Sequence, residues 1–295
     1  MTGSLRVAVC TNRPPARLAE CLAALRKQVP ADLLAVVASG ADADGLRALA
    51  AVAPGPLLHE PRLGLSHARN RALRWAEAGD VLAFVDDDAM VEPRWYAALS
   101  ACWKAAPASI GCIGGPIRPR FEIPPPAWLS PLLLPTLTVL DLGATARDLD
   151  PSVSTVYGAN VSFRVAPLRA VGGFDPSFGH RGDRISFSEE DEAQRALARI
   201  GFGTRYTPHA AVCHVIPAER LTRRAFLHRR FAYGATLGRR GARSRRLAAQ
   251  QLVTSGLGAA VAVATRAPQR LAMERVVRAA ENAGVLAGTL IRRRF

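Results

Sequence analysis

Val81-Leu82-Ala83-Phe84-Val85 is an uninterrupted apolar run that ends in three consecutive acids, Asp86-Asp87-Asp88. The run has the length of one strand. Because neither of its faces is polar, it predicts a strand covered on both sides, as in a parallel sheet with helices on each face. Side chains that follow such a strand lie at the carboxyl edge of the sheet, where open α/β sheets bind their ligands. The stretch therefore predicts both the fold class and the location of the functional site.

Strands and helices alternate over most of the chain. Strands are predicted at residues 5–10, 33–37, 81–85, 161–163 and 203–206, and helices at 18–25, 44–52, 64–78 and 189–200. This alternation is typical of an α/β fold with a mostly parallel central sheet flanked by helices. Residues 116–151 interrupt it with seven prolines between Pro116 and Pro135. We expect a long ordered loop over the site there.

The positive charge is concentrated at one end of the chain. The 295 residues carry 39 Lys and Arg against 24 Asp and Glu, a net charge of +15. Residues 1–214 hold 22 basic and 21 acidic groups, whereas 215–295 hold 17 and 3. We therefore expect a nearly neutral catalytic domain at 1–214 and a basic helical extension at 215–295. A hydrophobic content of 49% excludes a disordered chain.

Three adjacent carboxylates at a strand end repel one another, and a divalent cation would offset that repulsion. Hard oxygen ligands suit Mg²⁺ or Mn²⁺, ions that also bridge phosphate oxygens. The alternative is a solvated acidic turn. The five cysteines form no CxxC pair, so the sequence indicates neither a zinc site nor a disulfide framework.

A second acidic cluster, Ser188-Glu189-Glu190-Asp191-Glu192, precedes a helical stretch. The helix dipole favours acids at this position whether or not they react. If the cluster lies near the first one, however, one of its carboxylates can act as a general base toward an incoming hydroxyl.

The basic extension begins after His214, with Arg220, Arg223, Arg224, Arg229 and Arg230. These arginines either form a solvated helix face or bind phosphate oxygens. Further along, the apolar stretch Leu247–Ala264 precedes Arg266 and Arg270. It predicts either a helix pair packed on the core or peripheral attachment to an anionic membrane surface.

Several motifs occur in an order that resembles glycosyltransferase family 2, whose fold is called GT-A. They are Val7–Arg13, Gly64-Leu65-Ser66-His67-Ala68-Arg69-Asn70, Phe84–Asp88, Gly158-Ala159-Asn160, Gly172-Gly173-Phe174-Asp175 and Glu189–Leu197. The resemblance extends from Val7 to about Gly234. The segments around Pro116–Phe121, Pro124–Leu129 and Leu140–Gly143 are similar to a polysaccharide-associated subgroup.

The resemblance implies inverting transfer of a sugar from a nucleotide-diphosphate donor, by default a UDP-sugar. The acceptor would be a hydroxyl of a glycan, a lipid-linked saccharide or a small molecule. Residues 1–115 would bind the donor and 116–214 the acceptor. The implied donor contacts are Thr11, Asn12, Arg13, Arg69, Asp86, Asp87, His214, Arg220 and Arg223. The implied metal ligands are Asp86, Asp88 and His214. The implied acceptor contacts are Trp128, Asn160, Gly173, Phe174 and Glu189.

Two positions depart from the family pattern. Aligning Glu192 and Leu197 to the motif makes Glu190 the base, whereas a literal match to Glu190-Asp191 makes Asp191 the base. We favour Glu190. The family commonly has an Asp after its second strand to contact the nucleotide, whereas this chain has Val36-Val37-Ala38-Ser39. Asp42 or Asp44 from the following loop could substitute.

Two other functions fit parts of the sequence. A nucleotidyltransferase also combines carboxylate-bound metal with an α/β sheet, but Thr11-Asn12-Arg13-Pro14-Pro15 is not the Gly-rich phosphate loop it needs. A nucleic-acid-binding protein would suit the pI near 11, yet aromatic residues make up only 6% and no stacking platform is evident. We expect no nucleic acid partner. Residues 1–12 lack a signal pattern, and we expect a cytoplasmic protein, at most peripheral on the inner face of a membrane.

Overall fold

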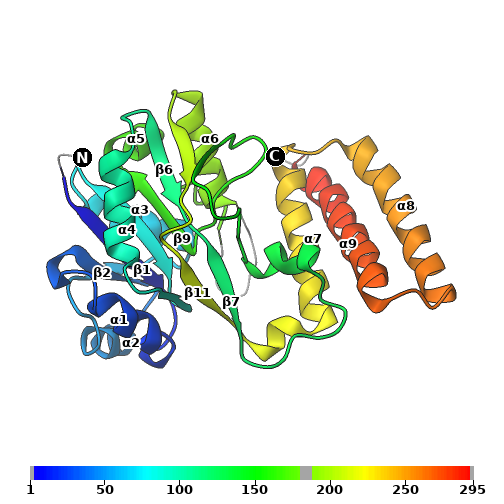
Figure 1. Ribbon diagram of the computed structural model, residues 1–295, viewed down its shortest axis with the longest axis horizontal. Helices are drawn as coiled ribbons and strands as arrows, with labels where there is room; N and C mark the ends of the chain where they lie inside the picture. Colours follow the sequence, from blue (N-terminus) through cyan, green and yellow to red (C-terminus); the bar gives the residue numbers. More distant parts are fainter. Residues whose placement is uncertain (1–2, 180–187, 293–295) are drawn as a thin grey trace. The chain divides into compact units, whose positions relative to one another are not determined.

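The chain divides into two compact units in a computed structural model that describes residues 3–179 and 188–292 (Figure 1). The first unit contains residues 3–119, 139–179 and 188–215, and the second contains 120–138 and 216–292. The division after residue 215 is one residue from the expected one. Residues 120–138, which we expect in the catalytic domain, group instead with the second unit.

An eight-stranded sheet forms the frame of the first unit, in the order β3-β2-β1-β4-β9-β6-β10-β8. Only β9 and β8 run antiparallel to their neighbours. The strands are β1 (Leu5–Thr11), β2 (Leu34–Ser39), β3 (Leu57–Glu60), β4 (Val81–Asp86), β6 (Ile110–Gly114), β8 (Arg147–Leu149), β9 (Asn160–Arg164) and β10 (Gly203–Tyr206). A second sheet has the order β5-β11-β7, with β5 (Ala89–Val91), β11 (Val212–Ile216) and β7 (Ile117–Phe121). The predicted mostly parallel α/β fold is confirmed.

Helices cover both faces of the large sheet, as alternate residues of β9 show. Asn160 and Ser162 face α4 (Trp95–Ala105), where Trp95 Nε1 donates to Asn160 Oδ1 at 3.0 Å and Trp103 Nε1 to Ser162 Oγ at 2.9 Å. Phe163 points to the opposite face, which α3 (Leu65–Trp75) covers. Because both faces are buried, strands such as Val81–Val85 are apolar throughout. The remaining helices of this unit are α1 (Ala19–Arg26), α2 (Ala43–Ala50), α5 (Val165–Ala170), α6 (Glu189–Arg199) and the short 3₁₀ turns Pro15–Arg17 and Ala31–Leu33.

The proline-rich segment is more regular than expected. Where the sequence predicts a loop over 116–151, the structure has β7, a 3₁₀ helix at Pro131–Leu137 and β8. Pro119 is tolerated because β7 is an edge strand, and Pro131 because it begins a helix, where its missing N–H is not needed. The prolines therefore restrict which elements form in this segment without preventing them.

Three long helices dominate the second unit: α7 (Arg223–Arg240), α8 (Arg245–Ala264) and α9 (Gln269–Arg292), preceded by a 3₁₀ turn at Ala218–Leu221. Within this unit α9 lies between α7 and α8 (Figure 1). Glycines allow α7 and α9 to approach closely: a Cβ on Gly234 would lie 2.0 Å from the carbonyl oxygen of Glu281, and one on Gly284 would lie 2.1 Å from that of Phe231. Among the described residues, no helix is both long and apolar enough to cross a membrane.

Candidate active site

The carboxyl ends of β1 and β4 lie side by side, because Cys10 is in register with Asp86. The chain after each strand then supplies polar groups to one edge of the sheet. Thr11 Oγ1 donates to Asp87 Oδ2 at 2.7 Å, and Arg13 Nη1 lies 3.3 Å from Asp87 Oδ1 and 3.1 Å from Asp88 Oδ2. The arginine and the hydroxyl thus hold the second and third acids in place and offset part of their repulsion.

His214 reaches the same carboxylates from a distant part of the chain. β11 pairs with β5 so that His214 is opposite Ala89, and the Val215 N–H donates to the Asp88 carbonyl at 2.9 Å. This pairing leaves His214 Nε2 3.2 Å from Asp88 Oδ1, with the imidazole almost fully buried. Sequence reasoning predicted both residues as ligands of one metal ion, and the structure does bring them together.

The carboxylate oxygens and the imidazole nitrogen at this edge fit a divalent cation that the substrate also binds. Burial raises the pKa of Asp87 to about 6, and Asp88 adds to the rise, although Arg13 opposes it. Within 3–179 and 188–292, no three acidic, His or Cys side chains form a complete metal cage. Mg²⁺ and Mn²⁺ do not require one when one or two protein ligands are completed by phosphate oxygens and water. Asp88 and His214 could supply two such protein ligands, and their role as metal ligands stays a prediction.

Arg69, on α3, connects the first acidic cluster to the second. Its side chain is only 2% exposed; Nη1 lies 2.9 Å from Glu189 Oε1 and 3.9 Å from Glu190 Oε2, and Nη2 lies 3.7 Å from Asp86 Oδ1. Asp86 itself remains 33% exposed. Its buried guanidinium thus balances carboxylates within the protein, and its role as a donor contact stays a prediction.

The first turn of α6 presents its acids in different directions. Glu190 Oε1 accepts from the Gly158 N–H at 3.0 Å, whereas Asp191 accepts from the Thr155 hydroxyl. Gly158 is required here, since a Cβ at this position would lie 2.3 Å from Arg69 Nη2. Of the two candidate bases, Glu190 is thus the one that lies near Arg69.

The environment of Glu190 favours the protonated carboxyl more than water does. Burial raises the pKa of Glu190 well above its usual range, and the neighbouring Glu189 and Asp191 carboxylates add to the rise, while Arg69 opposes it. Burial also raises the pKa of Glu189, against the opposing charge of Arg69. A carboxylate with a raised pKa binds protons more strongly, which suits a general base.

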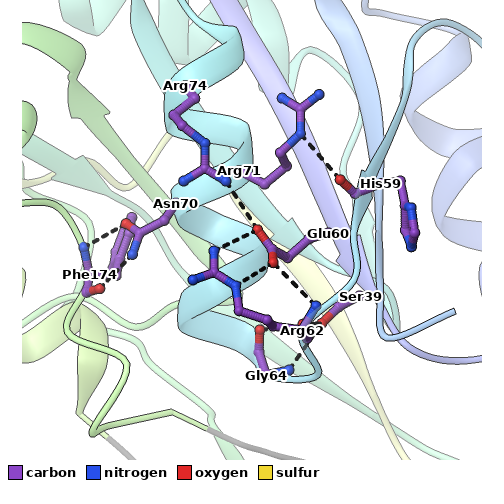
Figure 2. A network of polar contacts seen from close by, with 9 residues as sticks. All are labelled: Ser39, His59, Glu60, Arg62, Gly64, Asn70, Arg71, Arg74 and Phe174. Carbon is purple, nitrogen blue, oxygen red and sulfur yellow. Dashed lines mark hydrogen bonds and ion pairs between the residues drawn. The ribbon is translucent and has the colours of Figure 1, made fainter.

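A second polar network lies at the carboxyl end of β3 (Figure 2). Glu60 is buried and accepts from Arg62 Nε at 2.7 Å and from Arg74 Nη2 at 3.0 Å. These bonds, chiefly those from Arg62, lower the pKa of Glu60 to about 2. Ser39 Oγ donates to the Arg62 carbonyl and accepts from the Gly64 N–H, each at 3.0 Å. Ser39, the last residue of β2, thus holds the loop that leads into α3.

The two acids expected to replace the Asp of the family pattern are used elsewhere. Asp42 Oδ1 caps α2 by accepting from the Gly45 N–H at 2.8 Å, and Asp44 forms an ion pair with Arg47 one turn along the same helix. Both interactions stabilise a helix end. A nucleotide contact by Asp42 or Asp44 stays a prediction.

Several predicted acceptor contacts have structural roles. The buried Asn160 amide donates to the carbonyls of Pro116 and Ala210 and accepts from Trp95, so its hydrogen-bonding groups are already used within the frame. Phe174 is buried, and its backbone N–H and C=O both bond to the side chain of Asn70.

The other residues predicted to contact the acceptor lie in a turn, beside Arg69 and in the second unit. Gly173 has φ +74°, which makes it a turn residue. Glu189 is buried and pairs with Arg69, and its acceptor role stays a prediction. Trp128 packs edge to face on Phe226 within the second unit, with ring centroids 5.3 Å apart, and its acceptor role stays a prediction.

The arginines after His214 belong to the second unit. Arg229 donates to the Thr136 carbonyl at 3.4 Å and Arg230 pairs with Glu281, so these two are used in folding that unit. Arg220 and Arg223 stay predictions as diphosphate contacts, as does the exposed Asn12 of the first unit.

A mostly parallel sheet that gathers a strand-end acid triplet, a histidine and a buried helix-start carboxylate at one edge defines a glycosyltransferase of the GT-A type. The sequence profile described as "Glycosyl transferase family 2" matches residues 7–172, more than half of the chain. The protein therefore belongs to glycosyltransferase family 2. The resemblance stated from the motifs is confirmed, and family membership decides against the nucleotidyltransferase alternative.

Known proteins agree with this assignment. The chain is 28% identical over 152 residues to the glucosyl-dolichyl phosphate glucuronosyltransferase of Haloferax volcanii, covering 51% of this chain and 47% of that one. It therefore spans about half the length of this relative. It is 29% identical over 243 residues to the succinoglycan biosynthesis protein ExoM of Rhizobium meliloti, covering 79% and 74%.

Solved structures of low sequence identity share the fold. The mannosyltransferase PcManGT of Pyrobaculum calidifontis, in complex with GDP-Man and Mn²⁺, superposes with a TM-score of 0.56 at 18% identity, covering 97% of this chain and 75% of that one. GalNAc-T7 with UDP, GalNAc and Mn²⁺ superposes with a TM-score of 0.54 at 17% identity, covering 79% and 47%.

Proposed function

We propose that this protein is an inverting, metal-dependent glycosyltransferase that moves a sugar from a nucleoside-diphosphate donor to a hydroxyl acceptor. One observation carries the proposal: within one compact unit, Arg69 lies between the Asp86 carboxylate, which is 33% exposed, and the Glu190 carboxylate, which is 16% exposed. The site thus holds one carboxylate suited to a metal and diphosphate beside another suited to taking a proton.

Asp86, Asp88 and His214 would hold Mg²⁺ or Mn²⁺ together with the donor diphosphate. A bound cation at this position offsets the charge that develops on the leaving diphosphate. The structures of PcManGT and GalNAc-T7 in complex with Mn²⁺ and a nucleotide or nucleotide sugar support this assignment. UDP remains the default nucleotide, as the family resemblance implies.

Glu190 is the proposed base. It removes the proton of the acceptor hydroxyl while that oxygen forms a bond to the anomeric carbon of the sugar. The bond between the anomeric carbon and the diphosphate oxygen breaks with its electron pair going to the diphosphate, which inverts the anomeric centre. The raised pKa of Glu190 supports this choice over Asp191, which accepts a hydrogen bond from Thr155.

The acceptor is proposed to be the hydroxyl of a glycan, a lipid-linked saccharide or a small molecule. The names of the two sequence relatives concern polysaccharide synthesis and a dolichyl-phosphate-linked sugar, which supports a role in glycan assembly.

Product analysis with a panel of nucleotide sugars and Mn²⁺ tests the reaction. We expect free nucleoside diphosphate, and release of pyrophosphate instead would refute glycosyl transfer. Glu190→Gln should lower the transfer rate by about 10²- to 10⁴-fold, the usual effect of removing a general base, without loss of nucleotide binding. Glu192→Gln is a matched control on the same helical turn, where the carboxylate pairs with Arg199. A large loss in Asp191→Asn with normal Glu190→Gln activity would transfer the role of base to Asp191.

A further inference from the structure

Helix α8 in the second unit exposes large apolar side chains, whereas a helix in water usually buries them. The residues buried on its inner side are small and recur every seven positions: Ala248, Ser255 and Ala262. Four large apolar residues face outward, with Val253 60% and Leu257 65% exposed and with Leu247 and Val261 also on the surface. A helix that only had to fold in water would bury these side chains and expose the small ones.

The outward apolar residues form one continuous stripe. At 3.6 residues per turn, Val253, Leu257 and Val261 fall along neighbouring turns, and the exposed Ala260 and Ala264 extend the stripe toward the C-terminal end of the helix. No charged residue occurs between positions 247 and 264. The part of α9 that the structure describes covers the inner side of α8 and leaves this stripe open (Figure 1).

Arginines stand at both ends of the stripe. Arg245 and Arg246 begin α8, and the exposed Arg266 and Arg270 follow its end. Cations at a helix N-terminus oppose the helix dipole, so helix stability does not account for Arg245 and Arg246. Residues 245–270 contain no acid at all. The charge therefore complements an anionic surface, and the long arginine side chains can reach it from the edge of an apolar contact.

We propose that this face of α8 binds the surface of an anionic lipid bilayer, with the helix lying in the plane of the interface. The stripe would enter the boundary between headgroups and acyl chains, while the four arginines contact lipid phosphates. The helix lies on the membrane and does not cross it, in line with its limited hydropathy. This proposal does not depend on the proposed sugar transfer, because it rests only on the second unit.

Vesicle flotation of the full chain tests the proposal. We expect binding to vesicles of phosphatidylcholine mixed with phosphatidylglycerol, weak binding to phosphatidylcholine alone, and loss of binding as salt is raised. Leu257→Glu should reduce binding at least tenfold, on the order expected when a charge replaces an inserted leucine. Arg245→Gln with Arg246→Gln should reduce it about fivefold for each arginine.

Matched variants separate these effects from general ones. Val153→Glu places the same charge at an 84% exposed apolar site of the first unit, and Lys104→Gln removes a positive charge there; neither should alter binding. Circular dichroism checks that each variant is folded, and Leu257→Gln repeats the test without a new charge. Equal binding to both vesicle types, or full binding by both Leu257 variants, would overturn the proposal. A dimer in analytical ultracentrifugation that Leu257→Glu dissolves, with no vesicle binding, would overturn it in favour of a second copy of the chain.

Discussion

Replacing Arg69 by methionine removes the one cation that lies among three carboxylates. Methionine keeps a long apolar side chain against the rings of Phe84 and Phe174, which lie 5.5 and 5.6 Å from the guanidinium carbon. Packing is therefore largely retained, and the experiment isolates the charge. Glu189, at 2.9 Å and almost fully buried, is the group most affected.

The expected loss of stability is large. Removing one partner of a buried ion pair leaves the other charge without compensation and costs about 3–5 kcal/mol. Arg74→Met is the matched control, because Arg74 is half-exposed and its partner Glu60 keeps a second arginine, Arg62. Exposed pairs contribute about 1 kcal/mol or less, so the control should lose no more than that.

The loss also depends on pH with a defined sign. Arg69 lowers the pKa of Glu189 and of Glu190, so its removal raises both further above their ordinary values. A carboxyl whose folded pKa is raised contributes stability below its unfolded pKa and loses that contribution as pH rises through the folded pKa. Arg69→Met should therefore be more unstable in mildly alkaline than in mildly acidic buffer.

Urea unfolding at two pH values measures the free energy of unfolding, and the dependence of kcat/KM on pH reports the pKa of the general base. Because Glu190 must be deprotonated to act, the acid limb of the kcat/KM profile should move to higher pH in Arg69→Met. Arg69→Lys, which keeps the charge, should move it less. If Arg69→Met unfolds at the same urea concentration as the control and its acid limb stays in place, Arg69 does not control these carboxylates.

Two further predictions concern the metal site and the helices. Asp88→Ala and His214→Ala should each weaken Mn²⁺-dependent binding of UDP, measured by calorimetry, on the order of tenfold or more. The control is His209→Ala, five residues from His214 and exposed, which should leave the affinity for UDP unchanged. If the Asp88 and His214 variants bind UDP as tightly as the unaltered protein, these two residues do not belong to the metal site. In the second unit, Gly284→Ala should lower the free energy of unfolding by about 1–3 kcal/mol, because its Cβ would lie 2.1 Å from a carbonyl oxygen of α7. Gly256→Ala, with no atom within 4 Å, should instead gain roughly 0.5–1 kcal/mol; the reverse order in urea unfolding would contradict the α7 and α9 packing.

Local patterns predicted much of the fold. The apolar runs at β1, β2 and β4 identified strands buried on both faces, and Asp86, Asp87 and Asp88 marked the sheet edge. β3, β5, β6 and α4 were not predicted, and 116–151 was taken for a loop. Short strands and proline-containing turns have too few residues to show a hydrophobic period. Whether they form therefore depends on pairing with neighbouring strands.

The sequence by itself determined the buried strands β1, β2 and β4, the family and the two acidic clusters, because strand hydrophobicity and helix-start acids are local properties. Only the tertiary structure decided which side chains meet. The pairing of β11 with β5 brought His214 to Asp88, and the approach of α3 to α6 buried Arg69 between Asp86 and Glu190. The same packing directed the Asn160 amide into the frame and left Val253, Leu257 and Val261 of α8 exposed. Contacts between residues far apart in the chain follow from strand order and helix packing, which no local pattern records.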